Sequence, residues 1–140
     1  ASVVNTSSTS GLLGNPGQAN YGAAKAGIAA FTTIAAAELA RYGVRVNAIA
    51  PMARTRLTEA TPGWEDVLRA PDDPDQFDAW HPANVSPVVA WLATADCPVT
   101  GQVFYVHGGT VKVFTPWALG DGVERDSRWT VHDLNEWVRP

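Results

Sequence analysis

The sequence predicts an α/β fold in which helices cover an open, parallel sheet. Short apolar segments rich in β-branched residues alternate with helical segments, in the order strand, long helix, strand, helix, strand. The alanine-rich segment 19–41 is the longest helix, and a short strand stands on each side of it. Such alternation is typical of βαβ units, whose strands are parallel. Three strands are few for an open sheet of this kind, so we expect further strands outside this chain.

Local signals place the elements of the first half. Residues 2–5 form a short buried strand, and the polar residues and glycines over 6–17 form a turn and a loop. Gly43 follows the long helix, at the position where a glycine in the left-handed conformation ends many helices. A second strand covers 44–49, and we expect Pro51 to stop it.

The second half is less regular, because prolines and aspartates interrupt residues 52–80. We expect a core over 1–109 and a tail extension over 110–140. The elements predicted in this half are a short helix over 64–69, a helix over 85–94 capped by Asn84, a strand over 101–107, and, in the tail, a strand over 111–114 and a helix that begins at Thr130.

The composition argues against several classes of protein. The 140 residues carry 10 Lys and Arg against 14 Asp and Glu, and the net charge of −4 disfavours a nucleic-acid partner. Cys97 is the single cysteine, so the chain forms no internal disulfide and no thiolate zinc cage. His81, His107 and His132 lack the spacing of metal ligands. We therefore expect no metal site and no nucleic acid.

The expected location is the cytoplasm. A lone cysteine indicates a reducing compartment. No run of about 18 consecutive apolar residues is present, so we expect no membrane span. The first residues lack the charged and apolar regions of a signal peptide. The chain also begins without Met and directly on a strand, so we expect it to be part of a longer protein.

Three side chains near the start of the long helix suggest proton-transfer chemistry. Tyr21 and Lys25 are four residues apart, so they share one helix face. A tyrosine exchanges its proton with difficulty at neutral pH, and a nearby ammonium group favours the phenolate. Ser8 lies at the carboxyl end of the first strand, the edge at which open α/β sheets bind ligands. A hydroxyl there could hold a carbonyl oxygen while Tyr21 exchanges a proton with it.

A Tyr–Lys pair at this spacing also occurs by chance in many helices, but its combination with other segments is more specific. The segments are VVNTSSTSG (3–11), NYGAAKAG (20–27), VRVNAIAP (44–51) and GQVFYVHGG (101–109). Together they resemble the short-chain dehydrogenase/reductase family, although that family more often has Asp at the position of His107. The resemblance implies the C-terminal part of a doubly wound, Rossmann-like sheet that lacks the N-terminal βαβ cofactor half.

The resemblance assigns a role to each of the three side chains. It implies that Ser8 orients the substrate and that Tyr21 is the general acid and base. It implies that Lys25 binds the nicotinamide ribose and favours the phenolate of Tyr21. Tyr21 and Lys25 are therefore expected both in the catalytic set and among the cofactor-binding residues, with NAD or NADP as the cofactor.

The resemblance also implies that the second strand and the loop after it approach the nicotinamide through Asn47 and Pro51. The family usually has a glycine after this proline, whereas this chain has Met52. A threonine of the following loop contacts the cofactor in the family. Here Thr55 and Thr58 both fit that position, and the sequence leaves the choice open.

Three shorter segments, GNPGQANY (14–21), IAP (49–51) and RLT (56–58), are similar to a narrower group, the 3-hydroxyacyl-CoA dehydrogenase units of multifunctional β-oxidation enzymes. The wider family resemblance implies a homo-oligomeric parent that interconverts a secondary alcohol and a ketone. The narrower similarity makes a 3-hydroxyacyl thioester the favoured substrate. An oxoacyl-carrier-protein reductase or another carbonyl reductase is the alternative.

The glycine-rich turn that binds the pyrophosphate of such cofactors is not found in this chain. Gly11, Gly14 and Gly17 are spaced by three residues, which does not match G-x-G-x-x-G, so we interpret them as loop glycines. We therefore expect the isolated 140-residue chain to be inactive. A second hypothesis, from another class, is a non-catalytic half-domain that only assembles or binds.

Overall fold

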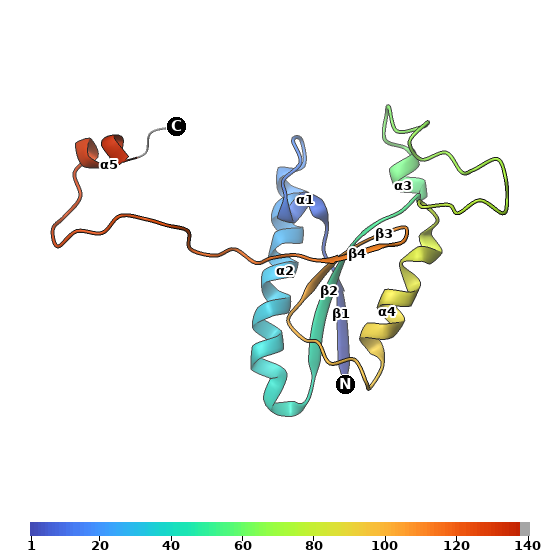
Figure 1. Ribbon diagram of the computed structural model, residues 1–140, viewed down its shortest axis with the longest axis horizontal. Coiled ribbons are helices and arrows are strands. Elements are labelled where there is room, and N and C mark those ends of the chain that lie inside the picture. The colour runs from blue at the N-terminus through green and yellow to red at the C-terminus, as the bar shows by residue number, and fades with distance from the viewer. Residues whose placement is uncertain (138–140) are drawn as a thin grey trace.

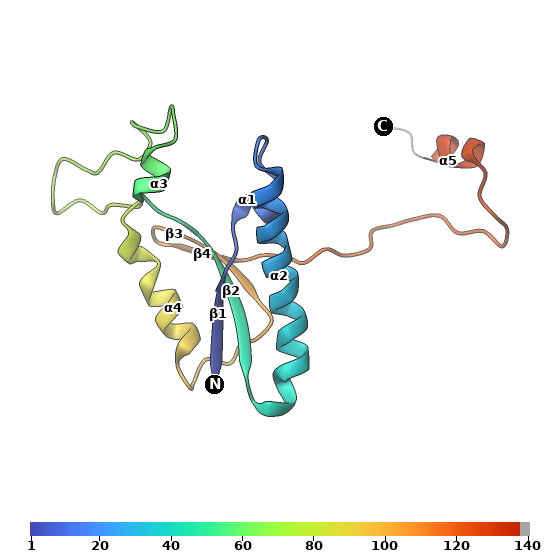
Figure 2. The ribbon, with the colours of Figure 1, turned by 180° about the vertical axis from the view of Figure 1, so that it is seen from behind.

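The fold is a four-stranded sheet with a long helix on one face and a shorter helix on the other, seen in a computed structural model that describes residues 1–137 (Figures 1 and 2). The last three residues of the expected tail, 138–140, lie outside the described residues. The elements are β1 (Ser2–Thr6), α1 (Thr9–Leu12), α2 (Ala19–Leu39), η1 (Ala40–Tyr42), β2 (Arg45–Met52), α3 (Arg56–Glu59), η2 (Pro82–Asn84), α4 (Ser86–Ala93), β3 (Val103–His107), β4 (Thr110–Val113) and α5 (Val131–Trp137).

The sheet has the order β1-β2-β3-β4. β1, β2 and β3 are parallel, as the alternation of strands and helices predicts, and β4 turns back to pair antiparallel with β3. The register places Thr6 opposite Ile49 and Met52 opposite His107. The carboxyl ends of the three parallel strands therefore meet at one edge, and within the described residues β1 is bonded to β2 alone.

α2 covers one face of the sheet with small side chains. Ala29, Ala35 and Ala36 are buried against sheet residues, and Thr32 is fully buried. The Thr32 hydroxyl donates to Ile28 O and accepts a hydrogen bond from the Asn5 amide, at 2.8 and 3.0 Å. α2 can therefore lie close to the sheet. The predicted end of this helix is also confirmed. The 3₁₀ turn η1 follows α2, and Gly43 has the left-handed conformation expected of a terminating glycine, with a φ of 65°.

The other face holds the largest apolar cluster. Leu92 of α4 is completely buried among Ile49, Phe104, Val106 and the free thiol of Cys97. These side chains come from β2, β3, α4 and the segment after it. The sheet thus has a core on both faces, which explains why β2, the strand between β1 and β3, is buried along most of its length.

α2 and η1 together are long and apolar enough to cross a membrane, because they span 24 residues and contain an 18-residue window with a mean hydropathy of 1.3. This criterion uses length and mean hydropathy, whereas we expected no membrane span because the sequence has no run of about 18 consecutive apolar residues. A core helix of a soluble protein passes the same test. Because α2 packs on the sheet and its Lys25 ammonium donates to Thr6 O at 2.9 Å, we assign it as a sheet-covering helix.

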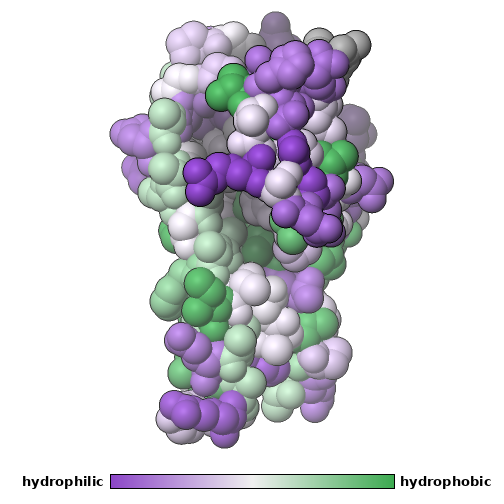
Figure 3. All heavy atoms as spheres, turned by 90° about the vertical axis from the view of Figure 1, so that its left-hand side faces the viewer, coloured by the Kyte–Doolittle hydropathy of each residue, from purple (hydrophilic) through white to green (hydrophobic). Residues whose placement is uncertain are grey.

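Part of the outer face of α2 is nevertheless apolar. Phe31 and Ile34 are 59% and 58% exposed. On the side of the molecule where α2 lies, pale and green residues predominate over purple ones in much of the lower half (Figure 3). Both side chains are therefore open to solvent for more than half of their surface in the described part of the chain.

Two predictions about the strands and loops of the first half were wrong. The segment 6–17 is not all loop, because Ser8 caps the four-residue helix α1. Pro51 does not stop β2, which continues to Met52. The O atom of Ile49 faces β1, where it accepts from Ser7 N, and residues two apart in a strand face the same way. Pro51 therefore faces past the end of β1, where no ladder hydrogen bond needs its missing N–H.

Two predictions about helices in the second half were also wrong. Residues 64–69 form turns, and the helix of this region is α3, which begins eight residues earlier. Asn84 does not cap α4, because its amide donates to the O atoms of Asp78 and Ala79 and Val85 takes the cap position.

The tail leaves the sheet after β4 and extends away from the body to α5 (Figure 1). The predicted capping arrangement is confirmed: Asp133 accepts from Thr130 N at 2.9 Å, and Thr130 accepts from Asp133 N at 3.2 Å. Hydrogen bonds from Thr130, with a further contribution from Arg125, hold the pKa of the Asp133 carboxyl below its usual value. In the extended part of the tail, between β4 and α5, the Trp117 side chain is 94% exposed to solvent.

We expect this 140-residue chain to self-associate, because the edge of β1 and the outer face of α2 are both open to another copy. Light scattering at rising protein concentration measures this directly. A Phe31→Glu variant separates the two surfaces, since it charges α2 and leaves the β1 edge unchanged. A monodisperse monomer of the unmodified chain at high concentration would contradict the expectation.

Candidate active site

Ser8 lies where the first parallel strand gives way to a helix. The ladder continues one residue past β1, because Ser7 N donates to Ile49 O at 2.7 Å. Ser8 then has an extended backbone, and its Oγ accepts from Ser10 N at 3.2 Å as the N-cap of α1. The Ser8 hydroxyl is thus held at the carboxyl edge of the sheet.

α1 packs against the backbone of α2 more closely than a side chain would allow. A Cβ atom added at Gly11 would lie 2.6 Å from Ala26 N and 2.8 Å from Lys25 Cβ. The Ser7 hydroxyl, buried beneath, donates to Lys25 O at 2.7 Å. The turn that follows Ser8 therefore lies directly against the helical turn that carries Lys25.

Lys25 and Tyr21 are brought together on this helical turn, as their spacing predicts. The Lys25 ammonium lies 5.7 Å from the centre of the Tyr21 ring. Its hydrogen bond to Thr6 O holds it at the end of β1. Tyr21 is 43% exposed, so its ring remains accessible to a ligand. A tyrosine hydroxyl on the same helix face as a fixed cation can exchange a proton with a bound oxygen.

Asn47 lies inside the fold and away from solvent. It is completely buried, its amide donates to Val99 O at 2.9 Å, and its Oδ1 accepts from Gln102 N at 3.1 Å. These bonds fasten the segment before β3 to β2. Any influence of Asn47 on a ligand therefore passes through the position of β2, whose end carries Pro51.

Thr55 and Thr58 form a reciprocal cap at the start of α3. Thr58 Oγ1 accepts from Thr55 N at 2.7 Å, and Thr55 Oγ1 accepts from Thr58 N at 3.2 Å. The two hydroxyl oxygens are 3.1 Å apart, and Thr55 is the more exposed residue. One ligand group could therefore contact both hydroxyls, so the choice that the sequence left open stays open.

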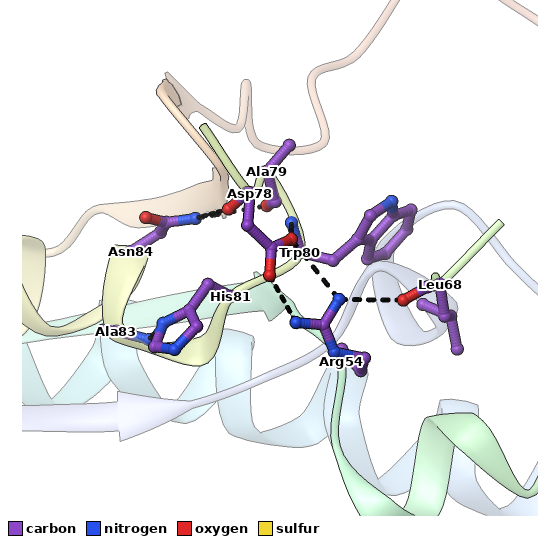
Figure 4. Close-up of polar contacts among 8 residues, drawn as sticks. All are labelled: Arg54, Leu68, Asp78, Ala79, Trp80, His81, Ala83 and Asn84. Carbon is purple, nitrogen blue, oxygen red and sulfur yellow. Dashed lines mark hydrogen bonds and ion pairs between the residues drawn. The ribbon is translucent and has the colours of Figure 1, made fainter. Parts of the chain in front are cut away.

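Arg54 and Asp78 form an ion pair that the sequence did not predict (Figure 4). The same guanidinium donates to Leu68 O at 2.8 Å, so one side chain joins three points of the segment 54–78. The hydrogen bond from Arg54, with another from Trp80 N, holds the pKa of the Asp78 carboxyl below its usual value, although partial burial opposes this. Residues this far apart in sequence leave no local pattern, so sequence reasoning could not find this pair.

Aromatic rings pack beside this ion pair. Trp80 contacts the His107 ring at 4.4 Å and the Trp64 ring at 6.0 Å between centroids. Within the described residues, the buried Nε2 of His107 has no hydrogen-bond partner. His107 therefore packs as an aromatic ring under the segment that Arg54 holds.

A pocket of about 600 Å³ opens beside α1. Its walls come from α1 and the loop after it, from Met52 at the end of β2, and from the β3–β4 hairpin. The Tyr105 hydroxyl lies 3.6 Å from the Met52 sulfur, and Lys112 brings a cation to the rim. Pockets of this size hold small organic ligands.

The described residues fit only one end of a nicotinamide dinucleotide. Lys25, Tyr21 and the exposed Thr55 offer donors of the kind that bind ribose and amide groups. The loop glycines do not form the G-x-G-x-x-G pyrophosphate turn. Gly11 packs against α2, and Gly14 and Gly17, with φ of 81° and 83°, lie three residues apart in the loop before α2.

Comparisons with known proteins point to one family. The family profile described as enoyl-(acyl carrier protein) reductase matches residues 1–111. A hydroxyacyl-CoA dehydrogenase of Mycobacterium tuberculosis is 48% identical over 117 residues, which is 81% of this chain and 35% of the relative. A peroxisomal hydratase-dehydrogenase-epimerase of Saccharomyces cerevisiae is 42% identical over 113 residues, 76% of this chain and 12% of the relative.

A solved structure agrees with the sequence relatives. The crystal structure of a short-chain dehydrogenase from Mycobacterium avium matches with a TM-score of 0.77 and 47% identity, over all of this chain and 47% of that chain. The chain thus spans less than half the length of each of these relatives.

Replacing Gly11 with alanine should disrupt the contact between α1 and α2. The added Cβ meets backbone atoms that cannot move aside, so we expect a loss of about 1–3 kcal/mol in the free energy of unfolding. Urea denaturation of the chain measures it. Gly109→Ala is the matched control, since nothing lies within 4 Å of its added Cβ. Equal stability of both variants would contradict the close packing.

Acid should weaken the Arg54–Asp78 contact. A carboxyl whose pKa is lowered in the folded state adds stability above its unfolded pKa of about 3.9 and loses it as the pH falls through the folded value. The unfolding free energy of the unmodified chain should therefore exceed that of Asp78→Asn at pH 6, and the difference should shrink below about pH 4. A difference that stays constant with pH would contradict the assignment.

Proposed function

Because the chain belongs to the short-chain dehydrogenase/reductase family, we propose that it carries the proton-transfer side of an NAD(P)-dependent oxidoreductase. The parent protein interconverts a secondary alcohol and a ketone. The observation that carries the proposal is the pair of Tyr21 and Lys25, whose ammonium group is held at the end of β1, the strand after which Ser8 follows.

In the direction of oxidation, the alcohol loses a proton from its oxygen and a hydride from its carbon. Tyr21 takes the proton, and Ser8 donates a hydrogen bond that holds the same oxygen. Lys25 stabilises the negative charge on the Tyr21 oxygen and binds the ribose next to it. The bound nicotinamide supplies the hydride acceptor. In the direction of reduction, the same side chains return the proton.

The remaining cofactor contacts come from the end of β2. We propose that Pro51 borders the nicotinamide and that Thr55 or Thr58 binds its amide. Asn47 contributes by holding the segment before β3 and so fixing β2. The pyrophosphate lies on residues beyond this chain, which is why we expect the isolated chain to be inactive and leave NAD and NADP as equal candidates.

We propose a 3-hydroxyacyl thioester as the substrate, with its acyl part in the pocket beside α1. The support is the name of the mycobacterial relative, a hydroxyacyl-CoA dehydrogenase, and the apolar part of the pocket wall. An oxoacyl-carrier-protein reductase is the second candidate, favoured by a 3-oxoacyl-[acyl-carrier-protein] reductase of Synechocystis that is 43% identical over 115 residues. The proposed location is the cytoplasm, in keeping with the buried, free thiol of Cys97.

We also propose that the parent is a homo-oligomer that uses the outer face of α2. Gly27 and Ala30 on this face permit close approach of another helix, and Phe31 and Ile34 supply exposed apolar area. A half-domain that only assembles is the competing hypothesis, and activity of the full-length protein decides between the two.

Replacing Tyr21 with phenylalanine in the full-length gene product should lower kcat by about 10²–10⁴ fold, because the proton donor is lost while the ring stays. Nicotinamide absorbance with 3-hydroxyacyl-CoA as substrate measures it. Tyr42→Phe is the matched control, since this exposed tyrosine stacks with Arg41 and lies far along the chain from the site. Unchanged activity of Tyr21→Phe would overturn the catalytic assignment.

A further inference from the structure

The segment after β2 leaves the sheet and returns to it at one fixed point. Arg54 N donates to Trp80 O at 2.7 Å, so the backbone closes the segment 55–79 into a single excursion. α3 and its Thr55–Thr58 cap lie at the start of this excursion. The position of the cap therefore depends on how firmly the two ends are held together.

The Arg54 side chain adds further contacts to this backbone closure. Its guanidinium pairs with Asp78 at the returning end and donates to Leu68 O in the middle (Figure 4). Leu68 is 2% exposed. Asp78 in turn accepts from Trp80 N at 3.0 Å. Asn84 holds the same returning end through its bonds to the O atoms of residues 78 and 79.

The Arg54 guanidinium is thus already bonded to two groups of the protein itself, the Asp78 carboxylate and Leu68 O. The ion-paired side chains are each 17% exposed, so the contact is shielded from water on most sides. A planar guanidinium can bind a carboxylate and a carbonyl at the same time, whereas a lysine ammonium is a point charge that does not reproduce this fork. Arg54 is therefore unsuited to bind a ligand phosphate and well suited to fix the excursion.

We propose that Arg54 is a positioning residue, which, with Asp78, clamps the excursion 55–79 so that Thr55 and Thr58 are held in place for the cofactor. The inference rests on the proposed function for the role of the threonines, but the clamp itself stands on the contacts of Arg54. Loss of the clamp removes the side-chain contacts that tie Leu68 and Asp78 to Arg54, so the excursion is held less firmly and the cofactor must order more of it on binding.

The test uses the full-length gene product with Arg54→Gln, Asp78→Asn, Arg54→Lys and the double Arg54→Gln/Asp78→Asn variant. Arg41→Gln is the matched control, because it removes an exposed arginine outside the site. Chymotrypsin followed by mass spectrometry measures cleavage at Phe77, which is 63% exposed, and at Trp64. Steady-state kinetics measure kcat and the cofactor KM.

We expect Arg54→Gln and Asp78→Asn to speed cleavage within 55–79 and to raise the cofactor KM roughly tenfold, with a smaller change in kcat. The double variant should be no worse than either single one, since both break one contact. Arg54→Lys should recover part of the loss in KM.

Two results would overturn the proposal. Unchanged cleavage in Arg54→Gln would show that the excursion does not depend on the clamp. Faster cleavage with an unchanged cofactor KM would show a structural role without positioning. If Tyr21→Phe is fully active, the proposed function fails by itself, and the cleavage result still reports separately on the clamp.

Discussion

The close packing of α1 against the backbone of α2 is the constraint on which the candidate site depends. With no side chain at Gly11, the turn after Ser8 can lie against the turn that carries Lys25. The Ser7 hydroxyl bonds to Lys25 O beneath this contact, and the Lys25 ammonium reaches back to Thr6 O. Strand end, short helix and long helix are thereby locked into one unit that presents hydroxyl groups and a cation on the same edge.

Sequence patterns predicted the large elements because their signals are local. The alanine content of α2, the glycine at position 43 and the alternation of strands and helices all act within a few residues. The same reasoning missed α1, which has only four residues and depends on the Ser8 cap, and it ended β2 too early. Pro51 fits inside β2 because the strand next to it has already ended, a fact of register that its neighbours in sequence do not carry.

The site was predictable to a similar extent. The pairing of Tyr21 with Lys25 follows from helix geometry, and the register of the parallel strands brings Ser8 and Pro51 to the same edge. The Arg54–Asp78 contact could not be predicted, because it joins residues 24 positions apart across irregular chain. The buried hydrogen bonds of Asn47 likewise depend on a loop more than fifty residues away.

The central claim is that Tyr21 and Lys25 form the edge at which the cofactor and substrate react. A crystal structure of the full-length gene product with a bound nicotinamide dinucleotide tests it most directly. The account predicts that the Tyr21 hydroxyl and the Lys25 ammonium lie within hydrogen-bonding distance of the ribose next to the nicotinamide, with Ser8 facing the same side. A cofactor bound elsewhere, with neither side chain in contact, would contradict it.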